Sequence, residues 1–224
     1  MPALATPSLR GLTPDAMTQG FDQLISGYRR FRDIGWQQQR ERWAELKDGQ
    51  TPRVMVIACS DSRVDPSQIF DTSPGEMFVV RNVAAMVPPF EAGGGRHGVS
   101  AALEFAVTQL EVSEIVVMGH GACGGVHAAL TRRFHQAPPG EGGFIAGWME
   151  LLDEARERII HDHGPDASRA MELEAVKVSL ANLRTFPFVV EREKAGTLRL
   201  RGAYFAISDG VLHLLGQDGV FNPA

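Results

Sequence analysis

The sequence of 224 residues contains only two cysteines, Cys59 and Cys123. So few cysteines exclude the disulfide framework that holds many small secreted proteins together. The sequence also lacks an excess of basic residues, because 22 lysines and arginines stand against 27 aspartates and glutamates. The formal charge of -5 gives no reason to expect nucleic acid or an anionic membrane as a partner.

Long hydrophobic runs are missing as well. The N-terminal stretch MPALATPSLRGLTP lacks the continuous apolar core of a signal peptide, and no run is long enough to span a bilayer. We therefore expect a soluble, cytoplasmic protein. In a reducing compartment two cysteines more often serve catalysis or metal binding than a disulfide, and a Cys59–Cys123 disulfide is the alternative if their strands are neighbours.

What the sequence does contain is 44% apolar residues, enough for a sizeable core. Several apolar runs show no polar alternation, which is typical of strands covered on both faces of a parallel sheet. We predict strands at 53–58, 77–81 and 114–118, helices at 97–110, 124–134, 144–163 and 170–185, and a final hairpin of 197–207 and 211–215. The expected fold is a single α/β domain over 1–224, with four parallel strands plus an antiparallel edge strand, flanked by helices.

Ahead of the first strand the sequence predicts a helical arm. Thr13-Pro14-Asp15 is typical of a helix start, with a hydroxyl cap and proline at the first helical position. Large apolar residues then recur at helical spacing as far as Leu46. We therefore divide the domain into an N-terminal arm, 1–48, and a core, 50–215. The arm needs an apolar surface to cover, either the chain's own core or a second subunit.

Each cysteine lies at or just past the end of a predicted buried strand. VMVIACSDSR carries Cys59 with Asp61 and Arg63, and IVVMGHGACGG carries His120 with Cys123. In open α/β sheets, ligands gather outside the carboxyl ends of the strands. Zinc prefers thiolate and imidazole, and catalytic zinc sites use three protein ligands and one open position. The pattern therefore indicates a zinc site, against the plainer interpretation of two small buried core residues.

Asp61 and Arg63 strengthen this interpretation. Two thiolates already cancel the charge of Zn²⁺, so a carboxylate as a further ligand would make the site anionic. Arg63 can hold Asp61 through two parallel hydrogen bonds and so keep it away from the metal.

Longer motifs resemble the β-carbonic anhydrase family, in particular its plant-like branch. They lie between 50 and 215 and read GQTPRVMVIACSDSRV, FVVRNVAAMVPP, HGVSAALEFAV, EIVVMGHGACGG, EAVKVSLANLRTFPFV and RGAYFAISDG. The resemblance implies a zinc lyase, a carbonate dehydratase, that reversibly hydrates carbon dioxide to bicarbonate and a proton by a zinc-bound hydroxide. It also implies a homodimer or a higher homo-oligomer. Because two thiolates on the metal would leave its water less acidic than in a three-histidine site, we expect activity to rise through the mildly alkaline range.

The resemblance assigns a role to each matching residue. It implies Cys59, His120 and Cys123 as zinc ligands, and Asp61 with Arg63 as the catalytic pair, with Asp61 on the metal in a closed form. The implied substrate-binding positions are Gln50, which in the family reaches across the dimer interface, the apolar Phe78 and Val83, and the backbone amide of Gly124.

Three positions depart from the family's patterns. Phe105 stands where plant-like members usually carry tyrosine, and Ala85 stands where the RNxAN motif has asparagine. Val56 stands where another branch has the tryptophan of a bicarbonate inhibitory site, so we expect no bicarbonate site next to Arg81. His97 and His127 are candidates for carrying the proton to solvent, beside the interpretation as a helix-start or surface histidine.

Other functions remain as alternatives. The same scaffold could hydrolyse CS2 or COS, or bind CO2 or bicarbonate without catalysis, although the intact Asp61 and Arg63 disfavour a mere binding protein. Residues 93–98, GGGRHG, match the GxGxxG pattern of dinucleotide-binding proteins. A loop with two prolines separates them from the preceding strand, which favours a flexible helix entry.

Overall fold

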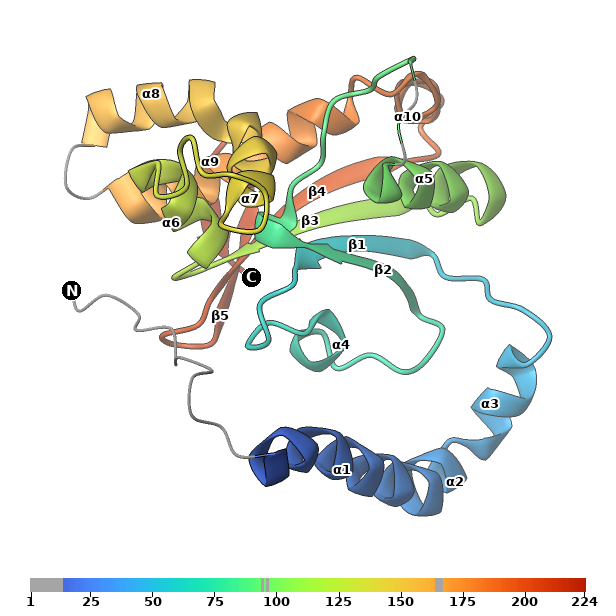
Figure 1. Cartoon of the computed structure of the whole chain (residues 1–224). Helices are drawn as coiled ribbons and strands as arrows, with labels where there is room; N and C mark the ends of the chain where they lie inside the picture. Colours follow the sequence, from blue (N-terminus) through green and yellow to red (C-terminus); the bar gives the residue numbers. More distant parts are fainter. Residues whose placement is uncertain (1–13, 94, 96, 164–166) are drawn as a thin grey trace. The chain divides into compact units, whose positions relative to one another are not determined.

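The computed structural model describes residues 14–93, 95, 97–163 and 167–224 (Figure 1). The chain divides into two compact units at Gly49. Among the described residues, no helix is both long and apolar enough to cross a membrane.

The first unit is helical, as the apolar spacing predicted. It contains α1 (Pro14–Arg30), the π-helical turn η1 (Phe31–Gly35), α2 (Trp36–Gln38) and α3 (Arg40–Leu46). The ring of Phe31 packs edge-on against that of Trp43, with centroids 6.1 Å apart. Thr13, the predicted cap of the first helix, lies outside the described residues. That one domain spans 1–224, with its core ending at 215, stays a prediction.

The second unit is built on a six-stranded sheet in the order β2-β1-β3-β4-β5-β6. Its strands are β1 (Val54–Cys59), β2 (Met77–Asn82), β3 (Glu114–His120), β4 (Arg199–Ala206), β5 (Val211–Leu215) and β6 (Phe221–Pro223). The first four pair in parallel, and β5 and β6 pair antiparallel. The predicted fold class is confirmed, and the sheet continues beyond the predicted edge by the short β6.

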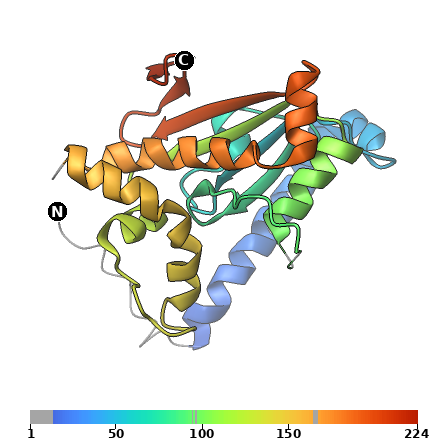
Figure 2. The same cartoon turned by 90° about the horizontal axis from the view of Figure 1, so that it is seen from above.

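Helices α5 to α10 lie on one face of this sheet and α4 lies on the other (Figure 1). The helices and turns are α4 (Pro66–Ile69), η2 (Val83–Ala85), α5 (Gly98–Glu104), η3 (Phe105–Gln109), α6 (Gly124–Thr131), α7 (Gly143–Met149), η4 (Glu150–Leu152), α8 (Asp153–His163), α9 (Ala167–Leu183) and α10 (Pro187–Lys194). Figure 2 shows α9 running along the sheet, and α9 contacts both β3 and β4. Each of the four predicted helices is present, although the one at 144–163 is divided at η4.

The core forms on both faces because strand side chains alternate. On the face of the long helices, Ile57 and Val117 pack with Leu180 of α9. On the other face, Ala58 and Met118 form a smaller cluster. This burial on both faces explains why the strands are apolar runs without alternation. The runs end at Cys59 in β1 and at His120 in β3.

Candidate metal centre

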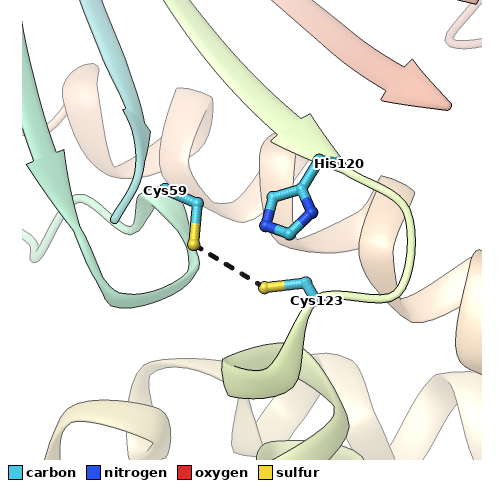
Figure 3. Close-up of side chains that lie close together, drawn as sticks. All are labelled: Cys59, His120 and Cys123. Atoms are coloured by element: carbon cyan, nitrogen blue, oxygen red, sulfur yellow. Dashed lines mark hydrogen bonds between the residues drawn. The ribbon is translucent and has the colours of Figure 1, made fainter. Parts of the chain in front are cut away.

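The two strands that end at the predicted ligands are neighbours in the sheet. β1 and β3 pair in parallel with Ala58 opposite Met118, so Cys59 and His120 leave the sheet at the same edge. Cys123 follows at the residue that precedes α6, after Ala122 turns the chain with a φ of 53°. Figure 3 shows the three side chains of Cys59, His120 and Cys123 turned toward one another.

The potential ligand atoms of these three buried residues all lie within 4.8 Å of one another. The sulfur atoms of Cys59 and Cys123 are 4.0 Å apart, and both thiols are free, so the alternative of a disulfide is not what the structure contains. Two sulfurs and one imidazole nitrogen at this spacing match the donor set that zinc prefers.

The imidazole of His120 is oriented for a ligand. Its Nδ1 lies 2.9 Å from the carbonyl oxygen of Gly121, which can only accept, so Nδ1 carries the proton. Nε2 is then an acceptor, and it is buried without a hydrogen-bond partner among the described residues. A buried polar atom without a partner costs about 1–3 kcal/mol, which coordination to a metal would offset. The residues present therefore fit a bound metal ion.

The two thiols are hydrogen-bonded to each other. The hydrogen bond from the Cys123 thiol lowers the pKa of Cys59, against the opposing effect of burial. The pKa of Cys123 is raised, because its thiol is the donor to Cys59 and because it is buried. A lowered pKa favours the thiolate, which is the form of cysteine that binds a metal.

Asp61 and Arg63 form the predicted two-bond pair. Nε of Arg63 donates to Oδ1 of Asp61 at 2.9 Å, and Nη2 donates to Oδ2 at 2.6 Å. The backbone N–H of Arg63 also donates to Oδ1, at 3.0 Å. These bonds to Arg63 hold the pKa of Asp61 well below its usual range. Asp61 is not among the three residues whose ligand atoms converge. Its carboxylate is bound to Arg63 instead.

Arg81 clamps the segment between the first ligand and Asp61. Its guanidinium donates to the carbonyl oxygens of Cys59 at 2.9 Å and Asp61 at 2.7 Å, and to the carboxylate of Asp65 at 3.0 Å. Sequence reasoning missed this role because the contacts join residues about twenty positions apart. That no bicarbonate binds next to Arg81 stays a prediction, and these three bonds support it.

Of the two predicted apolar pocket residues, Val83 directly follows Asn82, which pairs with Cys59. Phe78 stands opposite Met55, four residues before Cys59, so its role in the pocket stays a prediction. The ring of Phe78 packs against that of Phe105, with centroids 5.9 Å apart. Val83 lies against the start of α6, because a Cβ placed on Gly125 would come within 2.7 Å of its Cγ1. Val83 is 40% exposed, and Gly124 begins the same helix. Gln50 is exposed and makes none of these contacts, so its role stays a prediction.

One pair near the site was not predicted at all. The carboxylate of Glu172, on α9, accepts a hydrogen bond from the backbone N–H of Cys123 at 3.1 Å and another from the hydroxyl of Tyr204 at 2.8 Å. A signal for Glu172 exists in the sequence. It shares one face of a predicted helix with Val176, Ser179 and Leu183, and a carboxylate on an apolar face needs a partner.

A mostly parallel α/β sheet with a Cys-His-Cys set at the carboxyl ends of two neighbouring strands defines a metal-binding α/β protein. Comparison with known proteins agrees. The carbonic anhydrase family profile matches residues 54–212. Beta carbonic anhydrase 3 of Arabidopsis thaliana is 37% identical over 208 residues, which make up 91% of this chain and 80% of that protein.

Solved structures agree in the same way. The β-carbonic anhydrase CcaA matches with a TM-score of 0.84 at 30% identity, over 92% of each chain. Tetrameric β-carbonic anhydrases of Sordaria macrospora match with a TM-score of 0.75 at 26% identity, over 88% of this chain and 98% of theirs. The chain therefore belongs to the β-carbonic anhydrase family, whose members are lyases, and the predicted family is confirmed.

Proposed function

We propose that this chain catalyses the zinc-dependent, reversible hydration of carbon dioxide to bicarbonate and a proton. The observation that carries the proposal is the convergence of Cys59, His120 and Cys123, whose ligand atoms lie within 4.8 Å of one another at a buried site. Bound zinc would acidify a coordinated water and so supply hydroxide near neutral pH.

Asp61 would orient the attacking oxygen. Its Oδ1 already accepts two hydrogen bonds from Arg63, whereas Oδ2 accepts one. Because a carboxylate oxygen has two acceptor positions, Oδ2 keeps one for the hydrogen of the attacking hydroxyl group. An anion without a hydrogen at this position would be repelled by the negative Oδ2 of Asp61. Arg63 fixes the carboxylate for this role.

The remaining site residues would bind the substrate. Phe78 and Val83, the apolar pocket positions that the family resemblance implies, would contact carbon dioxide, which carries no charge. The N–H of Gly124 belongs to the first turn of α6, whose amides have no acceptor within the helix. This amide, together with Gln50 of a partner subunit, would stabilise the negative oxygen that develops during attack.

The working unit would be a homodimer or a larger homo-oligomer in the cytoplasm. The first unit presents large apolar side chains to solvent, with Phe21 67%, Leu24 69% and Tyr28 55% exposed. Apolar surface of this kind is typical of an interface, and a second copy of the chain is the partner we assign to it. A reducing compartment would keep Cys59 and Cys123 available as thiols.

The test combines zinc content with the rate of carbon dioxide hydration in a stopped-flow assay. We expect about one zinc per chain in the wild type, and Cys59→Ser should lose most of the zinc and more than about 100-fold of the activity. Asp61→Asn should keep the zinc but lose about 100-fold in kcat, since the oriented acceptor is gone. Ser60→Ala, at an exposed neighbour of the ligand, is the matched control and should change neither quantity.

Two results would contradict the proposal. One is a wild-type protein that contains zinc and hydrates carbon dioxide no faster than buffer. The other is a Cys59→Ser variant with full activity.

A further inference from the structure

A carboxylate is buried directly behind the metal centre. Among the residues that the structure describes, the buried polar or charged side chains are His120, Glu172 and Ser179. Glu172 is only 8% exposed, and burying a carboxylate is costly unless donors satisfy it. Its two oxygens have one donor each, the Cys123 amide on Oε1 at 3.1 Å and the Tyr204 hydroxyl on Oε2 at 2.8 Å.

The surroundings leave room for this arrangement. A Cβ on Gly121 would lie 3.1 Å from the Tyr204 hydroxyl, so glycine there gives the hydroxyl its space. A Cβ on Gly119 would lie 2.6 Å from Cγ2 of Val176, so α9 approaches the end of β3 at a distance that only glycine allows. This close approach brings Glu172 within reach of the ligand loop.

The Cys123 amide is a sensitive point of that loop. Cys123 precedes α6, where a serine or aspartate would usually cap the helix with its side chain, and its own side chain makes no such bond. The sulfur is therefore not used to cap the helix, and the backbone of the residue has its anchor elsewhere. The direction of the peptide plane at Cys123 decides where its Cβ, and hence its sulfur, points.

We propose that Glu172 is a positioning residue of the metal centre, which holds the Cys123 backbone so that the sulfur faces the ion, and that Tyr204 locks the carboxylate in place. Glu172 touches neither a ligand atom nor the reacting groups. It acts through the amide of a ligand, as outer groups around metal sites do when they orient the residues that bind the ion. The inference rests on the proposed zinc site.

The experiment measures the rate at which zinc passes from the holoenzyme to a chromophoric chelator. Glu172→Ala removes the anchor and should release zinc about 10–100-fold faster than the wild type. Glu172→Gln keeps a neutral oxygen that can accept from the Cys123 amide, and its tyrosine partner can accept as well as donate. Release from this variant should stay within about threefold of the wild type, because position and not charge is what matters.

Ser179→Ala is the matched control on the same helix. The hydroxyl of Ser179 also accepts a hydrogen bond from a buried backbone N–H, that of Val87 at 3.2 Å. Val87 is not one of the proposed metal ligands. The control should lose stability and keep the wild-type rate of zinc release. In cobalt-substituted protein, the sulfur-to-metal absorption bands should shift in Glu172→Ala and not in Ser179→Ala.

Three outcomes would overturn the inference: an unchanged release rate in Glu172→Ala, an equal acceleration in Ser179→Ala, or a Gln variant as fast as the Ala variant. If Glu172→Ala does not fold, Tyr204→Phe takes its place. It should release zinc about 3–10-fold faster through the loosened carboxylate, and an unchanged rate overturns the inference. A wild-type protein that binds no zinc would instead refute the proposed function itself.

Discussion

A single guanidinium, that of Arg63, joins the two halves of the metal centre. Besides its bonds to Asp61, Nη2 donates to the carbonyl oxygen of Ala122 at 3.1 Å, in the loop that leads to the third ligand. A lysine has one charged nitrogen and no planar fork, so it could not serve the carboxylate and this carbonyl in the same geometry. The residue type at this position is therefore set by shape as much as by charge.

The phenol of Tyr204 should resist ionisation. Burial raises its pKa above the usual value, and the hydrogen bond to Glu172 raises it further, since a phenolate there would face a carboxylate. In a Tyr28→Phe variant Tyr204 is the one remaining tyrosine of two. Near-ultraviolet absorbance should then show no phenolate in the folded protein below about pH 11, whereas the unfolded chain should ionise near pH 10.

The sign for stability follows from this raised pKa. The stabilising bond is fully present below the pKa of the unfolded state, near 10, and it is lost as the pH rises through the higher value of the folded state. The difference in the free energy of unfolding between Tyr28→Phe and Tyr204→Phe should therefore stay constant from about pH 7 to 9. Ionisation of Tyr204 near its ordinary pKa in the folded protein would contradict the assignment.

Single residues also mark what the sequence could and could not predict. Cys59 and His120 were identifiable because reactive side chains follow directly after buried strands. For Glu172 the sequence shows only a carboxylate on an apolar helix face, and its partners depend on how closely that helix approaches the sheet. Ala85, in place of the family's asparagine, has a φ of 55°, a conformation that asparagine adopts more readily. An alanine there costs about 1 kcal/mol, which gives this departure a physical meaning.

At the scale of elements, the C-terminus of α6 offers a stabilising change. The helix ends at Thr131, and the residue that follows, Arg132, has a φ of 50°. The N–H of Arg133 donates to the carbonyl oxygen of Ala128 at 3.1 Å. Glycine is the usual residue at this left-handed position. Arg132→Gly should raise the free energy of unfolding by about 1 kcal/mol in urea titrations, since only a weak exposed ion pair with Glu157 is lost.

The neighbouring position provides the control for this change. Arg133 lacks a positive φ, so Arg133→Gly should lower the free energy of unfolding, because glycine gives the unfolded chain more conformational entropy to lose on folding. A decrease in stability for Arg132→Gly would show that the left-handed turn is not strained. Hydration activity should be unchanged in both variants.

The elements themselves were predictable to different degrees. Strands without alternation stood out because both faces of the sheet are covered. Helix α10 was not predicted, although the proline at its first helical position favours a helix start. The strand β6 was missed because three residues are too few to show a pattern, and its pairing with β5 becomes visible only in the sheet.

At the scale of the whole molecule, the role of Gln50 can be tested by mixing two inactive variants. Cys59→Ser should disable its own site, whereas Gln50→Ala should weaken the site of its partner if the amide acts across the interface. After subunit exchange, half of the dimers are mixed, and each mixed dimer keeps one intact site. Activity should therefore recover to about a quarter of the wild type.

Mixing each variant with itself is the control and should recover nothing. Light scattering on the same samples should report a dimer or a larger assembly. No recovery despite proven exchange, or full activity in a wild-type monomer, would contradict an amide that acts between subunits.

The separation of the sulfurs along the chain carries a consequence for assembly. Cys59 and Cys123 lie 64 positions apart and meet only where two parallel strands have already paired. We therefore expect zinc to bind after these strands have paired and not to initiate folding. Bound zinc should therefore slow the unfolding of the sheet and leave its folding rate nearly unchanged.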